Sequence, residues 1–154
     1  MAKPTSMMSH VEWDWRSDSS VAYALLRLTF GVNICFRGVT RIAHGTEGFA
    51  NAIVTQLAPA TVLSPSMVHA YAYVLPWVES AIGLLLIFGL FTRSAMILGA
   101  LMMTSLTFGT MLVENFSNAW LQLTYAIAFF ILLSLRSWNL ISLDSLIWPS
   151  SRPD

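Results

Sequence analysis

The sequence has few of the residues that cover the surface of a soluble protein. Only 10% of its 154 residues are Asp, Glu, Lys or Arg, against about 25% in ordinary soluble domains. A chain with so few charges cannot surround a globular core with solvated side chains, so the composition favours a membrane protein. The eight basic and eight acidic residues cancel, which excludes a strongly basic surface and argues against a nucleic-acid partner.

Cysteine and histidine are also scarce. Cys35 is the single cysteine, so the chain has no second thiol with which to form an internal disulfide. The three histidines, His10, His44 and His69, include no pair at the spacing that metal sites use on one helix. A metal site at the surface, formed by His44 and His69, is the one such site that remains open. We find no catalytic triad, phosphate-binding loop or pair of catalytic carboxylates, and we therefore predict no catalytic residue, no metal and no intrinsic cofactor.

Long hydrophobic runs, in contrast, occupy most of the chain. A bilayer core of about 30 Å requires roughly 20 residues of helix, and four segments approach or exceed that length. Backbone groups in lipid must be hydrogen-bonded internally, which leaves helices or a closed barrel, and these runs do not alternate as barrel strands do. The sequence predicts an all-α, polytopic four-helix bundle (residues 21–147) between a polar segment (1–20) and a tail (148–154). The predicted spans are 21–43, 67–91, 94–113 and 119–135.

The basic residues predict how the bundle is oriented in the membrane. Four spans place both ends on one side, and that side carries five basic residues, Lys3, Arg16, Arg93, Arg136 and Arg152. The other side carries Arg41 and, near it, Arg37. By the positive-inside rule the termini are cytoplasmic and the long connection 45–66 is outside. We therefore expect a multi-pass protein of the inner (plasma) membrane.

Charged residues inside the predicted spans are the first candidates for a functional site. Arg27 and Arg37 lie in the first span and Glu79 in the second, and ionisable groups at such positions are costly unless they are paired. We predict that Glu79 pairs with Arg27 or Arg37, while Arg41 marks the outer boundary. The alternative is that the arginines extend to the two interfaces and have no functional role.

Two polar residues of the fourth span complete the candidate cluster. Gln122 and Tyr125 fall on one helical face, and such polar stripes usually form hydrogen bonds between helices. With Arg27, Arg37 and Glu79 they form a polar cluster that is either structural or a pocket for a ligand head group.

Three stretches of the sequence are "LLRLTFGVNICFRGVTRIAHGTEGFA", "VLPWVESAIGLLLIFGLFTR" and "NAWLQLTYAIAFFILLSLRSWNLISLDSL". Together they resemble the DoxX family of membrane proteins. The third stretch is similar to that family's last helix and its Ser-Leu-Asp tail. The resemblance covers about residues 21–147. It implies a four-helix inner-membrane protein related to the membrane subunit of thiosulfate:quinone oxidoreductase. Charged positions that recur in the family would be Arg27, Arg37, Glu79 and Arg93.

The resemblance and the composition together suggest a role. Because the chain has no electron-carrying group of its own, redox activity requires a partner that bears a cofactor. We expect an accessory or structural membrane subunit of a redox or electron-transfer complex, in contact with lipid, with membrane-protein partners and with quinone as a candidate ligand. One alternative is the quinone-reacting subunit of a thiosulfate:quinone oxidoreductase. A small-solute carrier is less favoured, because four spans without a clear internal repeat suit alternating access poorly.

The predicted orientation is directly testable. A reporter cysteine near Thr46 should react with a membrane-impermeant thiol reagent added to intact cells, whereas one near Ser151 should react only after the cells are opened. The reason is that the basic residues hold the side with the termini in the cytoplasm. The opposite labelling pattern would overturn the predicted orientation.

Overall fold

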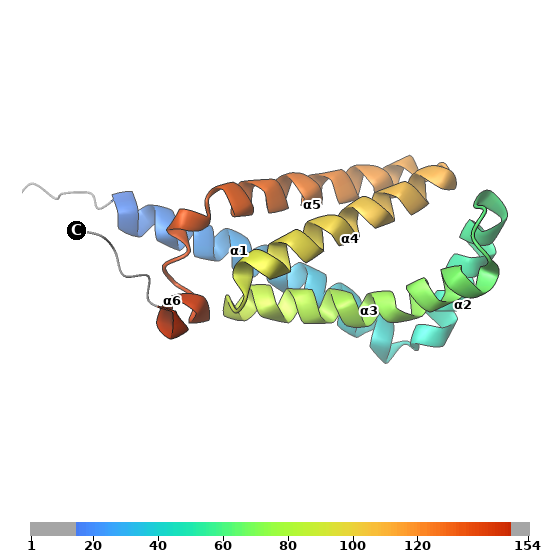
Figure 1. The fold of residues 1–154 in the computed structure, drawn as a ribbon, viewed down its shortest axis with the longest axis horizontal. Coiled ribbons are helices and arrows are strands. Elements are labelled where there is room, and N and C mark those ends of the chain that lie inside the picture. Colours follow the sequence, from blue (N-terminus) through green and yellow to red (C-terminus); the bar gives the residue numbers. More distant parts are fainter. Residues whose placement is uncertain (1–14, 149–154) are drawn as a thin grey trace, which may run out of the picture.

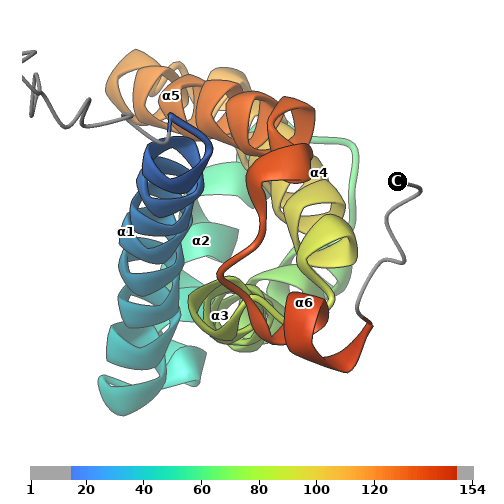
Figure 2. The same ribbon diagram turned by 90° about the vertical axis from the view of Figure 1, so that its left-hand side faces the viewer.

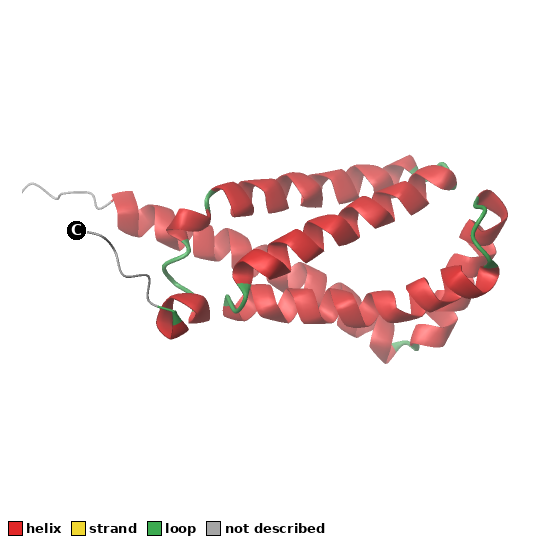
Figure 3. Cartoon of the chain, in the orientation of Figure 1, coloured by secondary structure: helices red, strands yellow, loops and turns green. Residues whose placement is uncertain are grey.

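The computed structural model describes residues 15–148, which contain helices and no strands. The α-helices are α1 (Trp15–Ala43), α2 (Thr46–Leu57), α3 (Pro65–Phe88), α4 (Thr92–Leu112), α5 (Phe116–Ser134) and α6 (Leu143–Ile147). Short 3-10 turns, η1 (Ala58–Ala60) and η2 (Arg136–Trp138), follow α2 and α5. Most of the predicted polar segment 1–20 and most of the tail 148–154 lie outside the described residues. Short loops join the helices, as Figure 3 shows.

The prediction of an all-helical protein with four membrane-length helices is confirmed. The segments long and apolar enough to cross a bilayer are Asp18–Ala43, Pro65–Phe88, Thr92–Leu112 and Phe116–Ser134. The start of α1 and the short helix α6 lie at the same end of the molecule (Figure 1), as an even number of spans requires. We call this the α6 end and the opposite one the α2 end.

Local sequence signals explain where α3 begins and ends. Ser64 caps its N-terminus by accepting a hydrogen bond from the backbone of Met67, and Pro65 follows at the first helical position, where a missing N–H is harmless. At the other end Gly89 adopts a left-handed conformation with φ 65°, which a residue without a side chain does at little cost. The turn to α4 is therefore short.

The helices pack as two pairs. α1 lies against α3 because glycines let the two backbones approach: Gly38 faces Pro76 and Ser80, and Gly83 faces the backbone of Cys35. α4 lies against α5, where the ring of Phe129 fills the space beside Gly99. Large apolar side chains buried between the helices form the core, among them Ile34, Leu86, Met96, Met103, Phe129 and Leu132.

The two pairs meet closely at the α6 end and diverge toward the α2 end. α3 and α4 share the tight turn at Gly89 and separate as they run away from it (Figure 1). Helix α2 lies across the wide end, between α1 and α4 in the view along the bundle (Figure 2). The long connection 45–66 is thus partly helical and covers the gap that the divergence leaves.

The segment after α5 closes the α6 end. The carboxylate of Asp144 accepts hydrogen bonds from the backbone N–H groups of Phe91 and Thr92, both at 2.7 Å, and the Asp144 N–H donates to the carbonyl of Gly89 at 2.9 Å. Phe91 has φ 46°, an uncommon value for a residue with a side chain. The carboxylate therefore caps the N-terminus of α4 and holds the strained turn in place.

Glycine substitutions test the close packing of α1 and α3. In Gly83→Ala the added methyl group would overlap the backbone of Cys35, so we expect a loss of about 1–3 kcal/mol, the usual cost of overpacking. Gly48→Ala is the matched control, because a methyl group there meets open space, and it should be neutral or stabilising. Thermal unfolding in detergent, followed by circular dichroism, measures both. Equal melting temperatures for the two variants would contradict this account of the packing.

Candidate functional site

Glu79 is a buried acid of the bundle, and two arginines of α1 neutralise it. Its side chain is 0% exposed, and its Oε2 lies 2.5 Å from an Nη1–H donor of Arg41. Its Oε1 lies 4.0 Å from Nε of Arg37. Arg37 and Arg41 are one helical turn apart and so project from the same face of α1 toward α3.

This arrangement corrects the expected pairing. Arg41, expected to mark only the outer boundary, makes the short contact with Glu79, and Arg37 lies farther from the carboxylate. Arg27, the other expected partner, is not part of the cluster. The glycine contacts place Glu79 level with the last turns of α1, and Arg27 lies ten residues, or about 15 Å, before Arg37 along the same helix.

Arg27 instead stabilises the α6 end. Its side chain is 4% exposed, and one of its Nη2–H groups donates to the carbonyl of Ile141 at 2.8 Å. The guanidinium fits against Gly89, where a larger residue would collide with it. This position at the C-terminus of α3 also places a cation at the negative end of the helix dipole. Arg27 therefore ties the segment after α5 to the α3–α4 turn.

Tyr125 and Gln122 connect α5 to its neighbours. The Tyr125 hydroxyl donates to the side-chain oxygen of Asn33 on α1, and its ring lies under the guanidinium of Arg37, 5.6 Å from the ring centre. Gln122 accepts a hydrogen bond from the Thr110 hydroxyl of α4 at 2.8 Å. Each side chain makes the kind of contact between helices that a polar stripe predicts.

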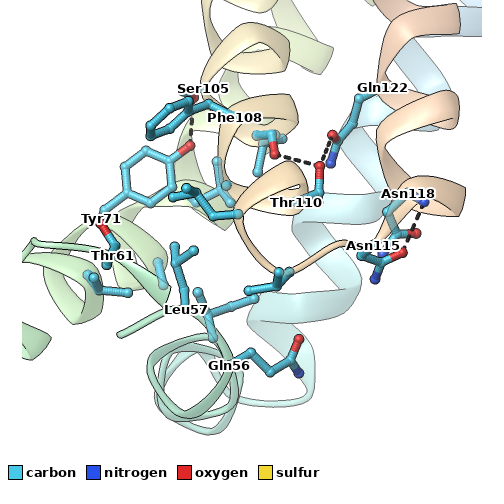
Figure 4. Close-up of a pocket in the computed structure, with 18 of the residues that line it drawn as sticks. Gln56, Leu57, Thr61, Tyr71, Ser105, Phe108, Thr110, Asn115, Asn118 and Gln122 are labelled. Atoms are coloured by element: carbon cyan, nitrogen blue, oxygen red, sulfur yellow. Dashed lines mark hydrogen bonds between the residues drawn. The ribbon is translucent and has the colours of Figure 1, made fainter. Parts of the chain in front are cut away.

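The divergence of the two helix pairs leaves a cavity of about 490 Å³ at the α2 end. Every helix from α1 to α5 contributes to its wall, and representative residues are Arg37, Arg41, Leu57, Tyr71, Thr110 and Gln122. Figure 4 shows the polar groups at its edges, including the 2.7 Å hydrogen bond between the hydroxyls of Tyr71 and Ser105, which bridges α3 and α4. Of the five predicted site residues, Arg37 and Gln122 line this cavity.

Sequence reasoning did not find this cavity or the residues that α2 supplies to it. Phe49 of α2 lies under the guanidinium of Arg41, 4.5 Å from the ring centre, and Leu57 approaches Gly109 of α4. The only available signal was the mildly amphipathic pattern of residues 48–58, which does not reveal what the helix covers. The cavity depends on how far α4 moves away from α3, and hydropathy carries no such information.

The charges at the cavity do not balance. Arg37 and Arg41 bring two positive charges and Glu79 one negative charge. The Nη1 atom of Arg37 is buried and has no hydrogen-bond partner within residues 15–148. In water such a group would be hydrated, and an unpaired buried donor costs free energy. The site therefore has unused hydrogen-bonding capacity next to an apolar cavity.

The histidines that left open a surface metal site have separate partners. Nδ1 of His44 lies 2.7 Å from the carbonyl of Thr40, and Nε2 of His69 lies 3.0 Å from Oε1 of Glu47. In the described part of the chain, no group of three or more His, Cys, Asp or Glu side chains is placed to hold a metal ion. The contact of His44 lies at the end of α1, and the contact of His69 joins α3 to α2.

Fold and site together define a small helical membrane protein with a charged cavity at one end. Residues 19–119 match the family described as "Methylamine utilisation protein MauE", and the chain belongs to this family of membrane proteins. The matched region runs from α1 into α5 and includes the Arg37–Arg41–Glu79 cluster. Comparisons with curated proteins and with solved structures gave no match.

The resemblance to the DoxX family is wrong, because the family match is to MauE. The stretches that suggested DoxX consist of an arginine in one helix, a glutamate in the next and glycines between them. Any small helical bundle in lipid needs small residues where helices touch and pairs for its buried charges. These features therefore do not distinguish families. The thiosulfate:quinone oxidoreductase alternative rested on that resemblance and is not carried further.

The ion cluster can be tested with one conservative substitution. Glu79→Gln removes the carboxylate and leaves Arg41 and Arg37 without a counter-charge, so we expect a marked loss of stability. Breaking a buried pair costs about 3–5 kcal/mol, and the lower part of this range applies because both arginines remain 26% exposed. Adding Arg41→Gln should restore part of the loss. Melting temperature and yield in detergent measure each variant.

Glu47→Gln is the matched control for this substitution. Glu47 also pairs with a basic group, His69, but its side chain is 64% exposed, and exposed pairs contribute about 1 kcal/mol or less. We expect little change in its melting temperature. If Glu79→Gln is as stable as Glu47→Gln, the carboxylate does not neutralise the arginines in the way the geometry implies.

Proposed function

We propose that this chain is an accessory membrane protein of a redox system that uses methylamine. The observation that carries the proposal is the match of residues 19–119 to the methylamine utilisation family. Releasing the nitrogen of methylamine for growth involves oxidation at its carbon atom, and the electrons must pass to a carrier. A protein dedicated to methylamine utilisation thus works beside redox chemistry.

An accessory role fits the residues better than a catalytic one. Cys35 is the single thiol of the chain and is buried in α1, so the chain cannot cycle between a dithiol and an internal disulfide. The electrons would then travel through groups bound to partner proteins. The accessory protein would assemble, anchor or position these partners at the membrane.

One face of α5 offers a surface for a membrane-protein partner. It carries large exposed apolar residues at helical spacing, Phe116, Trp120, Leu123, Ile127 and Phe130. Aromatic side chains of this kind are enriched where proteins meet, and a helix from a partner could pack along this stripe. The expected quinone contact remains a prediction, and so does the location in the inner membrane.

Deleting the gene from a host that grows on methylamine tests the proposed function. Growth with methylamine as nutrient should be lost, and growth on a substrate that requires no amine oxidation should be unchanged. The wild-type gene on a plasmid should restore growth. Gentle purification of the tagged chain from such cells should also recover at least one cofactor-bearing protein. Unchanged growth on methylamine, together with a chain that elutes alone, would overturn the proposal.

A further inference from the structure

We propose that the cavity at the α2 end binds an amphiphile from the membrane, with its acidic head group at Arg37 and its apolar tail between α3 and α4. This inference goes beyond the proposed function, since it assigns a ligand class to a cavity that an accessory role does not require. It stands on the charge, the lining and the opening of the cavity.

The charge at the cavity favours an anion. Arg41 already occupies Oε2 of Glu79, and Arg37 approaches the other oxygen only to 4.0 Å. Nη1 of Arg37 is buried without a hydrogen-bond partner among the described residues, and Arg37 belongs to the cavity wall. A carboxylate or phosphate placed there would accept a charge-assisted hydrogen bond and offset the excess positive charge.

The rest of the lining suits a hydrocarbon tail. Most of the wall is made of apolar side chains, such as Leu57, Val68, Leu75 and Leu106. Its volume of about 490 Å³ falls in the range of about 300–1,000 Å³ that is usual for small-molecule sites. An inorganic anion would leave this surface without a partner, whereas an acyl or alkyl chain would fill it.

The opening of the cavity faces the side of the bundle. Lining residues from both flanking helices are exposed there: Met67 at 59%, Tyr71 at 42% and Phe108 at 65%. Figure 4 shows Tyr71 of α3 and Phe108 of α4 beside each other at this edge. Since both helices are membrane-length segments, a ligand that enters between them comes from the lipid phase.

A fluorescent fatty acid tests the proposal on the purified, full-length protein in a neutral detergent. We expect 11-(dansylamino)undecanoic acid to bind saturably at one site per chain and to be displaced by laurate or dodecyl phosphate. Its methyl ester should bind weakly. Arg37→Gln should weaken binding of the acid by about tenfold or more, since a charge-assisted contact is lost. Arg93→Gln, which removes an arginine at the other end of the bundle, should bind as the wild type does.

A second variant keeps the test independent of the ion cluster. Gly109 lines the cavity, and a methyl group there makes only an ordinary contact with Leu57. The remaining atoms of the side chain in Gly109→Leu would extend into the cavity, so we expect this variant to fold and to reduce binding by filling the space. If Arg37→Gln fails to fold, loss of binding in a well-folded Gly109→Leu protein still supports the site.

The competing ligands, laurate and dodecyl phosphate, distinguish the two sources from which the acidic head group could come. Stronger displacement by laurate indicates a free fatty acid, and stronger displacement by dodecyl phosphate indicates a lipid phosphate. Displacement by orthophosphate alone, or by decylubiquinone but not laurate, would overturn the proposal in favour of a free anion or a neutral quinone. Equal binding of acid and ester would also overturn it. None of these results depends on growth with methylamine, so the two proposals can fail separately.

Discussion

The close contact between α1 and α3 at Gly38 and Gly83 is the constraint on which the other features depend. It determines the register of the antiparallel pair, because each glycine accepts the backbone of the opposite helix. With that register, Glu79 lies beside Arg37 and Arg41, and Gly89 lies beside Arg27. Packing and electrostatics are therefore coupled. If α1 shifted by one turn along α3, the carboxylate of Glu79 would be buried in an apolar interior without its counter-charges, which is strongly unfavourable.

The same packing accounts for the open end of the molecule. α4 and α5 form their own pair around Gly99 and Phe129, and the segment after α5 links the two pairs at the α6 end. There Asp144 caps α4 and Arg27 holds the carbonyl of Ile141. Away from this end the pairs diverge, and α2 covers the gap. A cavity with charged groups on its inner wall is the result.

The family assignment shows how little the motifs of a small membrane protein reveal about its relatives. Glycines at helix contacts and an arginine–glutamate pair are solutions that lipid imposes on many bundles. They suggested the DoxX family, and the match over residues 19–119 instead identifies MauE. The expectation of an accessory role in a redox system rested on that resemblance together with the lack of an electron carrier in the sequence, and of these two grounds only the second remains.

The amino-acid sequence alone determined the helical class and the number of spans, through hydropathy, segment length and the positions of glycine. It also determined that Glu79, inside an apolar span, needs a basic partner. Each of these properties depends on residues that are near one another in the chain. The tertiary structure decided which arginine takes that role, where Arg27 binds and that Asp144 caps a helix 52 residues before it. It also decided that a cavity exists. These features arise from the register and the crossing of helices far apart in sequence. A periodic apolar pattern permits several such arrangements, and only the packing of all the side chains selects one.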